Sequence, residues 1–191
     1  MGYENKKLLY HLTRAENLDN IFKYGLLSRN QVESLGFIDV ANPKIIMKRN
    51  VQNLNSYIPF HFQPSSAFDA EVKHKFGGEK FVYITIKRSY AEQMGFKIIP
   101  SHPLNPDCDI YDYSEGFQKI NWKAMDTKKE EFPDDETKEY GKQVKMAECL
   151  SETQIPVEAF WKIYCPKEAL VHYKERYNEY QHLFLEGCWF D

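Results

Sequence analysis

One carboxylate of the sequence stands among apolar neighbours. Glu148 lies in the segment Lys145-Met146-Ala147-Glu148-Cys149-Leu150. Burial removes water from a carboxylate, which costs free energy unless the charge is paired. Proteins accept this cost mainly where the carboxylate has a function, so such residues are enriched at active sites. A carboxylate can stabilise positive charge that develops on a sugar, or assist the deprotonation of an attacking group. Glu148 is therefore a candidate catalytic residue, and a glutamate at a strand edge or on a helix surface is the alternative.

A short basic stretch contains a candidate anion-binding residue. Lys44, Lys48 and Arg49 lie within six positions of one another. The planar guanidinium of arginine can grip a diphosphate or a carboxylate with two parallel hydrogen bonds, whereas a lone exposed arginine contributes mainly solubility. Arg49 is the candidate for a binding role.

A third set lies near the start of the chain. His11 lies at the end of a predicted strand, Thr13 follows that strand, and Asn17 can cap the next helix. A histidine at the end of a strand can bind a ligand, and a structural or surface histidine is the alternative.

The elements around these residues are predicted from apolar periodicity and turn signals. Strands are predicted at residues 8–12, 57–62, 81–86, 96–99 and 160–165. Helices are predicted between Asn17 and Gly25, after a Ser89-x-x-Glu92 capping box, around Trp122 and over residues 167–186. Several short strands with interspersed helices indicate an α+β fold.

Two segments remain ambiguous. Residues 28–56 are polar and irregular, which is long for a structureless connection, so they form a lid or binding loop or contain a helix. Residues 143–150 fit either a helix or a strand. In a strand, one face would carry Val144, Met146, Glu148 and Leu150.

Composition limits the class of protein. The chain has 191 residues, of which 42% are hydrophobic, so a single domain (1–191) with one sizeable core is expected. The cysteines show neither disulfide nor zinc spacing: Cys108, Cys149, Cys165 and Cys188. Free thiols, and the lack of a signal peptide or a long apolar run, predict a cytoplasmic protein that does not enter a membrane. The net charge of −3 argues against a protein that coats nucleic acid through bulk positive charge, so any nucleic-acid site must be local.

Three motifs resemble those of the DarT family, the toxins of DarT–DarG systems. YHLTRAENLDNIFKYGLL (residues 10–27) resembles Y-[HR]-[IL]-T-x-x-[DE]-N-L-x-x-I-L-x-x-G-x-L, KMAECL (145–150) resembles Q-A-E-F-L, and SYIPFHFQP (56–64) resembles D-Y-V-P-F-Y-F-x-P. Two weaker matches are Ile120-Asn121-Trp122 and Cys188-Trp189-Phe190. The order of the motifs holds over nearly the whole chain.

This resemblance implies an ADP-ribosyltransferase fold, a split mixed β-sheet with flanking helices that clasps NAD as co-substrate, without a metal. It assigns catalysis to Glu148 and Arg49, and binding of NAD to His11, Thr13, Asn17, Arg49 and His102. The implied activity is transfer of ADP-ribose to a base of single-stranded DNA.

Unpaired bases stack on aromatic rings while basic groups track phosphates, so Lys48, Tyr57 and Phe60 are the expected DNA contacts. A plain core role is the alternative for Tyr57 and Phe60. The segment Pro64-Ser65-Ser66-Ala67-Phe68-Asp69 departs from the P-R-S-P-M-L of the family. The family has thymine-directed and guanine-directed branches, and this departure favours guanine slightly while leaving both open.

The resemblance also implies a toxin of a toxin–antitoxin or phage-defence system, countered by a DarG-like or other ADP-ribosyl-DNA hydrolase antitoxin. One alternative is an enzyme of the same fold that modifies RNA or protein. Another is a nonenzymatic module that binds NAD or nucleic acid. The presence of both Glu148 and Arg49 counts against that second alternative.

Overall fold

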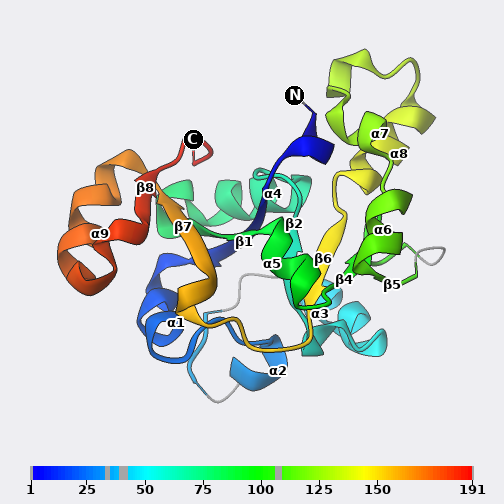
Figure 1. Ribbon diagram of the computed structural model, residues 1–191. Helices are drawn as coiled ribbons and strands as arrows, with labels where there is room; N and C mark the ends of the chain where they lie inside the picture. Colours follow the sequence, from blue (N-terminus) through cyan, green and yellow to red (C-terminus); the bar gives the residue numbers. More distant parts are fainter. Residues whose placement is uncertain (1, 33–34, 39–42, 106–108, 191) are drawn as a thin grey trace.

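The computed structural model describes residues 2–32, 35–38, 43–105 and 109–190. These residues form a mixed sheet of eight strands in the order β5-β4-β6-β2-β1-β3-β7-β8 (Figure 1). The strands are β1 (Leu8–Arg14), β2 (Ile58–His61), β3 (Phe81–Lys87), β4 (Lys97–Ile99), β5 (Tyr111–Asp112), β6 (Glu148–Ser151), β7 (Phe160–Cys165) and β8 (Phe184–Glu186). Pairing is antiparallel except between β7 and β8, which are parallel.

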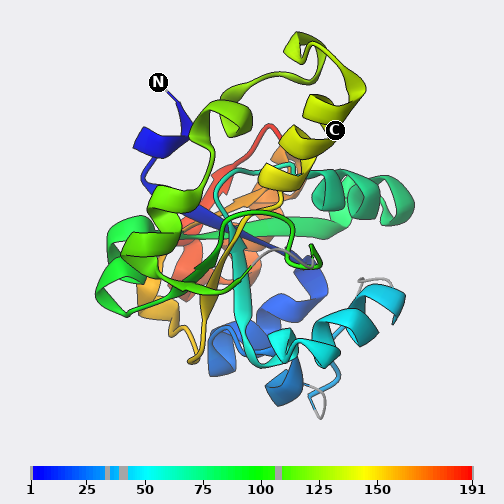
Figure 2. The same cartoon turned by 90° about the vertical axis from the view of Figure 1, so that its right-hand side faces the viewer.

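Helices cover both faces of this sheet. They are α1 (Leu18–Tyr24), α2 (Arg29–Val32), α3 (Pro43–Val51), α4 (Ala67–Phe76), α5 (Arg88–Gln93), α6 (Tyr113–Lys119), α7 (Trp122–Asp126), α8 (Asp135–Val144) and α9 (Leu170–Arg176). In Figure 2, α3 and α4 lie on one side of the strands, and α5 and α6 lie on the other. No helix in the described ranges is long and apolar enough to cross a membrane.

The sheet divides into two halves between β1 and β2. β1 pairs with β3 over seven residue pairs, from Leu8 opposite Lys87 to Arg14 opposite Phe81. By contrast, β1 and β2 share the single pair Tyr10 and His61. The two halves therefore diverge from one point, which confirms the expected split mixed sheet and α+β class.

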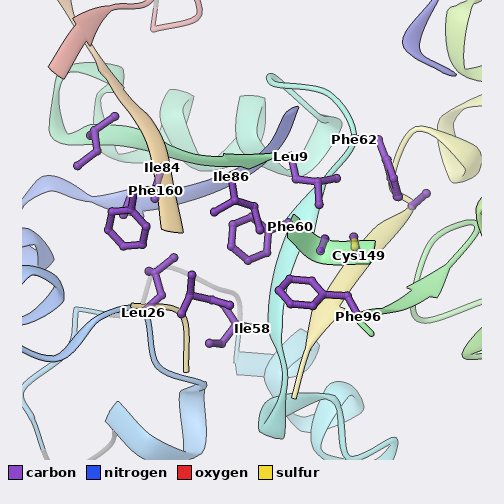
Figure 3. Close-up of a cluster of buried hydrophobic side chains, with 14 of the residues drawn as sticks. Leu9, Leu26, Ile58, Phe60, Phe62, Ile84, Ile86, Phe96, Cys149 and Phe160 are labelled. Atoms are coloured by element: carbon purple, nitrogen blue, oxygen red, sulfur yellow. The ribbon is translucent and has the colours of Figure 1, made fainter. Parts of the chain in front are cut away.

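The main core lies on the face of the sheet that α5 and α6 cover. Phe60, Cys149, Ile84 and Ile86 are fully buried there, as Figure 3 shows. Fully burying a large apolar side chain stabilises a fold by about 1.5–3 kcal/mol. A smaller cluster on the opposite face packs α4 against β3 through Val72, Phe81 and Tyr83.

Most predicted elements are confirmed. The strands at β1, β2, β3, β4 and β7 form where apolar residues concentrate, and Trp122 begins α7. α1 ends at Gly25, whose φ of 75° is favourable only for glycine. The long segment 28–56 contains helices, α2 and α3, in addition to irregular chain.

The predicted helix over 167–186 is confirmed only at Leu170–Arg176, and its predicted extent is wrong. α9 ends at Arg176 because Tyr177 leaves the helical region, with φ −113° and ψ 53°. A 3₁₀ segment follows, and the chain then enters β8, where Phe184 is buried opposite Ile163 of β7. Burial of Phe184 against β7 therefore favours a strand where the local sequence predicted a helix.

Two further local predictions are wrong. α5 begins at Arg88 rather than after Ser89, and no side chain caps it. Residues 143–150 are neither one helix nor one strand, since α8 runs through Val144 and β6 begins at Glu148. Val144 and Met146 therefore do not share a strand face with Glu148.

Candidate active site

A cavity opens where the two halves of the sheet diverge. Its walls come from β1, α1, the chain after Gly25, α3, β2 and the start of β6. Seven of the residues predicted for function line it: His11, Thr13, Asn17, Arg49, Tyr57, His102 and Glu148. The fold thus brings together positions separated by up to 137 residues, as from His11 to Glu148.

Glu148 is fixed by β6, which is paired on both sides. His61 of β2 and Ile99 of β4 are its partners across the two ladders. A residue in a strand paired on both edges has little freedom of backbone movement. The Glu148 carboxylate therefore has a defined place at the base of the cavity.

Arg49 of α3 forms an ion pair with this carboxylate. Its Nη1 donates to Oε1 at 2.8 Å and to Oε2 at 3.0 Å. The two side chains are only 11% and 6% exposed, so each charge depends on the other for compensation. Within the described residues no hydrogen bond occupies Nε or Nη2 of Arg49, and those donors are left for a ligand. A carboxylate has about four acceptor positions, so Glu148 also keeps some.

His11 sits in the gap between β1 and β2. Its Nδ1 donates to the Pro59 carbonyl at 2.8 Å. Burial lowers the pKa of His11, although that hydrogen bond opposes the shift. The ring is therefore neutral at pH 7 with its proton on Nδ1, and Nε2 can accept a hydrogen bond from a hydroxyl.

His102 presents the opposite tautomer. Its Nδ1 accepts a hydrogen bond from the Leu104 amide at 3.0 Å. Burial lowers the pKa of His102, with the Glu148 charge opposing the shift and Arg49 reinforcing it. The neutral ring thus carries its proton on Nε2 and can donate to a ligand.

Thr13 and Asn17 form an internal network in one cavity wall. The Asn17 amide donates to Thr13 Oγ1 at 3.2 Å and to the Ile38 carbonyl at 3.3 Å, and it accepts from the Ile38 amide at 3.0 Å. The expected capping bond from Asn17 to α1 is absent among the bonds of this helix. Asn17 instead connects Ile38 to the start of α1, so its amide shapes the cavity wall. Binding of NAD by Thr13 and Asn17 stays a prediction.

His61 is a cavity residue that sequence reasoning missed. It ends β2 opposite Glu148, is 8% exposed, and its Nδ1 lies 3.3 Å from the Ala147 carbonyl. Its signal in the sequence is alternation, because Pro59 and His61 must leave β2 on the face opposite the core residue Phe60.

The predicted DNA contacts meet different outcomes. Phe60 is fully buried in the main core (Figure 3), which leaves it no surface for stacking on a base and corrects that assignment. Tyr57 is partly exposed at the cavity, with its hydroxyl 3.3 Å from Glu152 Oε1. The side chain of Lys48 lies outside the described part of the structure.

The segment that departs from the DarT motif has a local structural role. Ser66 Oγ accepts from the Asp69 amide at 3.2 Å, and Asp69 Oδ2 accepts from the Ser66 amide at 3.0 Å. This reciprocal pair is a capping box that begins α4. Tyr83 also donates to Asp69 at 3.0 Å, which anchors α4 to β3.

The described residues contain no group of three or more His, Cys, Asp or Glu side chains that could hold a metal ion. Cys149, Cys165 and Cys188 are free thiols, and Cys108 lies outside the described residues.

Comparison with known proteins gives matches of family and of fold. Residues 10–179 match the family model of DarT, described as ssDNA thymidine ADP-ribosyltransferase. The structure of Thermosipho africanus DarTG in complex with ADP-ribose aligns with a TM-score of 0.78 at 20% identity over 95% of this chain. This chain spans only 50% of that longer protein.

Two structures of Thermus sp. 2.9 DarT are also similar. The complex with ADP-ribosylated ssDNA gives a TM-score of 0.76 at 18% identity, covering 94% of this chain and 91% of that one. The complex with NAD+ gives 0.72 at 17% identity, covering 94% and 92%. At these identities the likeness shows a shared fold. No curated protein matches the sequence.

Proposed function

The chain belongs to the DarT family of ssDNA thymidine ADP-ribosyltransferases, and from that premise we propose that it transfers ADP-ribose from NAD to a base of single-stranded DNA. The observation that carries the proposal is the buried Arg49–Glu148 pair in a cavity between the two halves of the sheet. A buried ion pair stabilises a fold little compared with apolar residues of the same size. The presence of this ion pair in an open cavity is therefore better explained by a role in binding or catalysis than by stability.

The residues of the cavity fit the groups of NAD. The free donors of Arg49 suit a diphosphate, because guanidinium–phosphate hydrogen bonds are charge-assisted and can be paired. His11 Nε2 can accept from a ribose hydroxyl, and the N–H of His102 can donate to a ligand oxygen. Apolar side chains such as Ile21, Leu26 and Ile38 line the remaining wall and suit a flat ring. NAD would supply the ADP-ribosyl group that is transferred.

Glu148 supports the transfer by its charge. As the bond between the ribose and nicotinamide breaks, positive charge develops on the sugar, and a fixed carboxylate beside it lowers the barrier. The electron pair of the broken bond leaves with neutral nicotinamide. The two hydrogen bonds from Arg49 hold the Glu148 carboxylate in one position, so little reorganisation is needed.

The base of DNA is the finer part of the proposal. The family description names thymidine, which supports thymine as the target, and guanine is the alternative left open by the Ser65 and Ser66 segment. A base must leave the helical stack to reach a cavity, which favours single-stranded DNA. The partly exposed Tyr57 is the proposed stacking residue, and Lys48 the proposed phosphate contact.

Modification of DNA in this way would block replication, so we propose a toxin that acts in the cytoplasm. The similar Thermosipho africanus protein is named DarTG. This supports a DarG-like or other ADP-ribosyl-DNA hydrolase as the antitoxin partner.

The test is direct. The protein is incubated with NAD and a single-stranded oligonucleotide, its duplex, an RNA of the same sequence or a polypeptide, and the products are digested and analysed by mass spectrometry. We expect an ADP-ribosyl nucleoside from the single strand alone, with its mass assigning the base. Modification of RNA or polypeptide but not of DNA would overturn the proposed substrate. Binding of NAD without any transfer would indicate a nonenzymatic module.

A further inference from the structure

His61 lies at the point where the two halves of the sheet meet. It is the partner of Tyr10 across β1 and β2, and of Glu148 across β2 and β6. Directly opposed residues of neighbouring antiparallel strands have Cβ atoms about 4.5–5.5 Å apart on the same face. The side chains of His61 and Glu148 are therefore direct neighbours on one face of the sheet, and both line the cavity.

The hydrogen bonding of His61 identifies its reactive nitrogen. Nδ1 lies 3.3 Å from the Ala147 carbonyl, which can only accept, so Nδ1 carries a proton. Nε2 has no hydrogen-bond partner among the residues that the structure describes. In the neutral ring, Nε2 is thus the acceptor and the nitrogen that gains or loses a proton.

The other two histidines of the cavity do not offer this combination. His102 accepts through Nδ1 from the Leu104 amide, so its neutral ring has only a donor left for the cavity. His11 has a free acceptor, but it alternates with Tyr10 along β1 and leaves that strand on the face opposite the one shared by Tyr10, His61 and Glu148. His61 alone among the three has an acceptor nitrogen on the face of Glu148.

On the basis of the proposed function, we propose that Nε2 of His61 accepts the proton that the target base loses during transfer. The base nitrogen forms a bond to the ribose anomeric carbon as the bond to nicotinamide breaks. The N–H bond of the base breaks, its electron pair stays on the base, and the proton moves to Nε2. The imidazolium then releases the proton to solvent. Both oxygens of Glu148 accept from Arg49, so Glu148 has no part in this proton transfer.

Several ionisable groups surround His61. They are Glu148 of β6, Arg49 of α3, His11 of β1 and His102, which line the same cavity. Tyr10 is the neighbour of His61 on β1, and Asp69 of α4 acts on the adjacent His11. Because a proton acceptor must be unprotonated to act, catalysis of this kind predicts that the transfer rate of the wild-type protein falls as the pH is lowered.

The test uses His61→Asn in the full chain. The asparagine amide can still donate to the Ala147 carbonyl, but it has no group that takes up a proton at the position of Nε2. We expect the rate of transfer to DNA to fall by about 10²-fold, with unchanged NAD affinity in calorimetry and loss of the acidic limb of the pH–rate profile. The matched control is His172→Asn, a histidine exposed on α9, which should change none of these quantities.

Transfer at the wild-type rate by His61→Asn would overturn the inference. So would a slow variant whose acidic limb persists, because that would show a positioning role only. If His61→Asn does not fold, His61→Gln replaces it, with the same expected rate and pH profile. Failure of the wild-type protein itself to modify DNA would instead overturn the proposed function, so the two failures are distinguishable.

Discussion

β2 and β6 present two faces that are both buried, one lined by apolar side chains and the other by ionisable ones. Phe60 and Cys149 point from one face into the main core and are 0% exposed. Their neighbours His61 and Glu148 point into the cavity and are 8% and 4% exposed. The first face gains stability from each side chain that it buries. The second removes a charge and an imidazole from water, which opposes folding unless each has a partner.

This difference separates the residues that stabilise the fold from those that we propose to act in binding and transfer. Apolar burial is non-directional and roughly proportional to area, so many apolar residues could serve on the core face. The cavity face tolerates fewer substitutions in function, because a charge there must be both paired and available to a ligand. Variants on the two faces should therefore affect stability and activity in opposite proportions.

The largest expected effect on activity is that of Glu148→Gln. Removing the charge while keeping the shape should lower the rate of ADP-ribose transfer by about 10²–10⁴-fold. The glutamine oxygen can still accept from Arg49, but the buried Arg49 charge loses its counter-charge, so the rate is compared at a temperature where both proteins are folded. Initial rates with labelled NAD measure the transfer, and thermal melts identify that temperature. Transfer near the wild-type rate would remove Glu148 from catalysis.

The converse variant is Phe60→Ala on the core face. Loss of a buried phenylalanine should lower the free energy of unfolding by about 3–5 kcal/mol. Denaturant titration measures this loss, and assays below the unfolding midpoint should show that the folded molecules keep most of their activity. Phe60→Leu is the milder control. A large loss of activity at normal stability would break the comparison between the two faces.

Arg49→Ala should lower both the affinity for NAD and the stability of the fold. Loss of charge-assisted hydrogen bonds to a diphosphate should weaken NAD affinity by about 1.5–3 kcal/mol, as measured by calorimetry. Stability should also fall, because Glu148 would be left buried without its partner.

The double variant Arg49→Ala/Glu148→Gln is the control for the ion pair. It should be more stable than Arg49→Ala alone, since no unpaired charge remains. Unchanged NAD affinity in folded Arg49→Ala would exclude Arg49 from binding.

The smallest expected effect is on pH dependence of stability. Burial lowers the pKa values of His11 and His102. As the pH falls, the unfolded chain takes up protons first, so their contribution to stability is complete above the unfolded value of about 6.5 and is lost as the pH falls towards the folded value. The melting temperature should therefore fall on acidification.

His11→Gln should show a shallower decrease in melting temperature than the wild type. The exposed His172→Gln is its control and should follow the wild-type curve. An identical decrease in His11→Gln and the wild type would contradict the role of His11 burial.

The sequence was sufficient to predict β1, β2, β3, β4, β7 and several helices of this fold, but not β5 or β8. Strands such as β3 are runs of apolar residues, and the turn at Gly25 has a local conformational cause. The helix over 167–186 could not be excluded locally, because Phe184 pairs with a strand that ends 19 residues earlier. Burial of Phe184 depends on contacts that a local pattern does not contain.

In the candidate site too, some features could be predicted from local sequence and others depend on contacts between distant residues. Glu148 was identifiable because a carboxylate among apolar residues is unusual and because its motif matches a family. Its ion pair with Arg49 could not be predicted, since the two residues are 99 positions apart. His61 was overlooked because it lies within an aromatic run, where alternation shows its face only after the strand and its partners are known.

The single residue pair between β1 and β2 has a mechanical consequence. A ladder of seven pairs, as between β1 and β3, resists bending, because tilting the strands would break many main-chain hydrogen bonds together. A single residue pair, as between β1 and β2, offers little resistance to a change of angle between the strands. A bound molecule can thus change the angle between the halves without breaking a ladder, so the work of closing around it is small. We therefore expect the cavity width to change more readily than the position of Glu148, whose strand is paired on both sides.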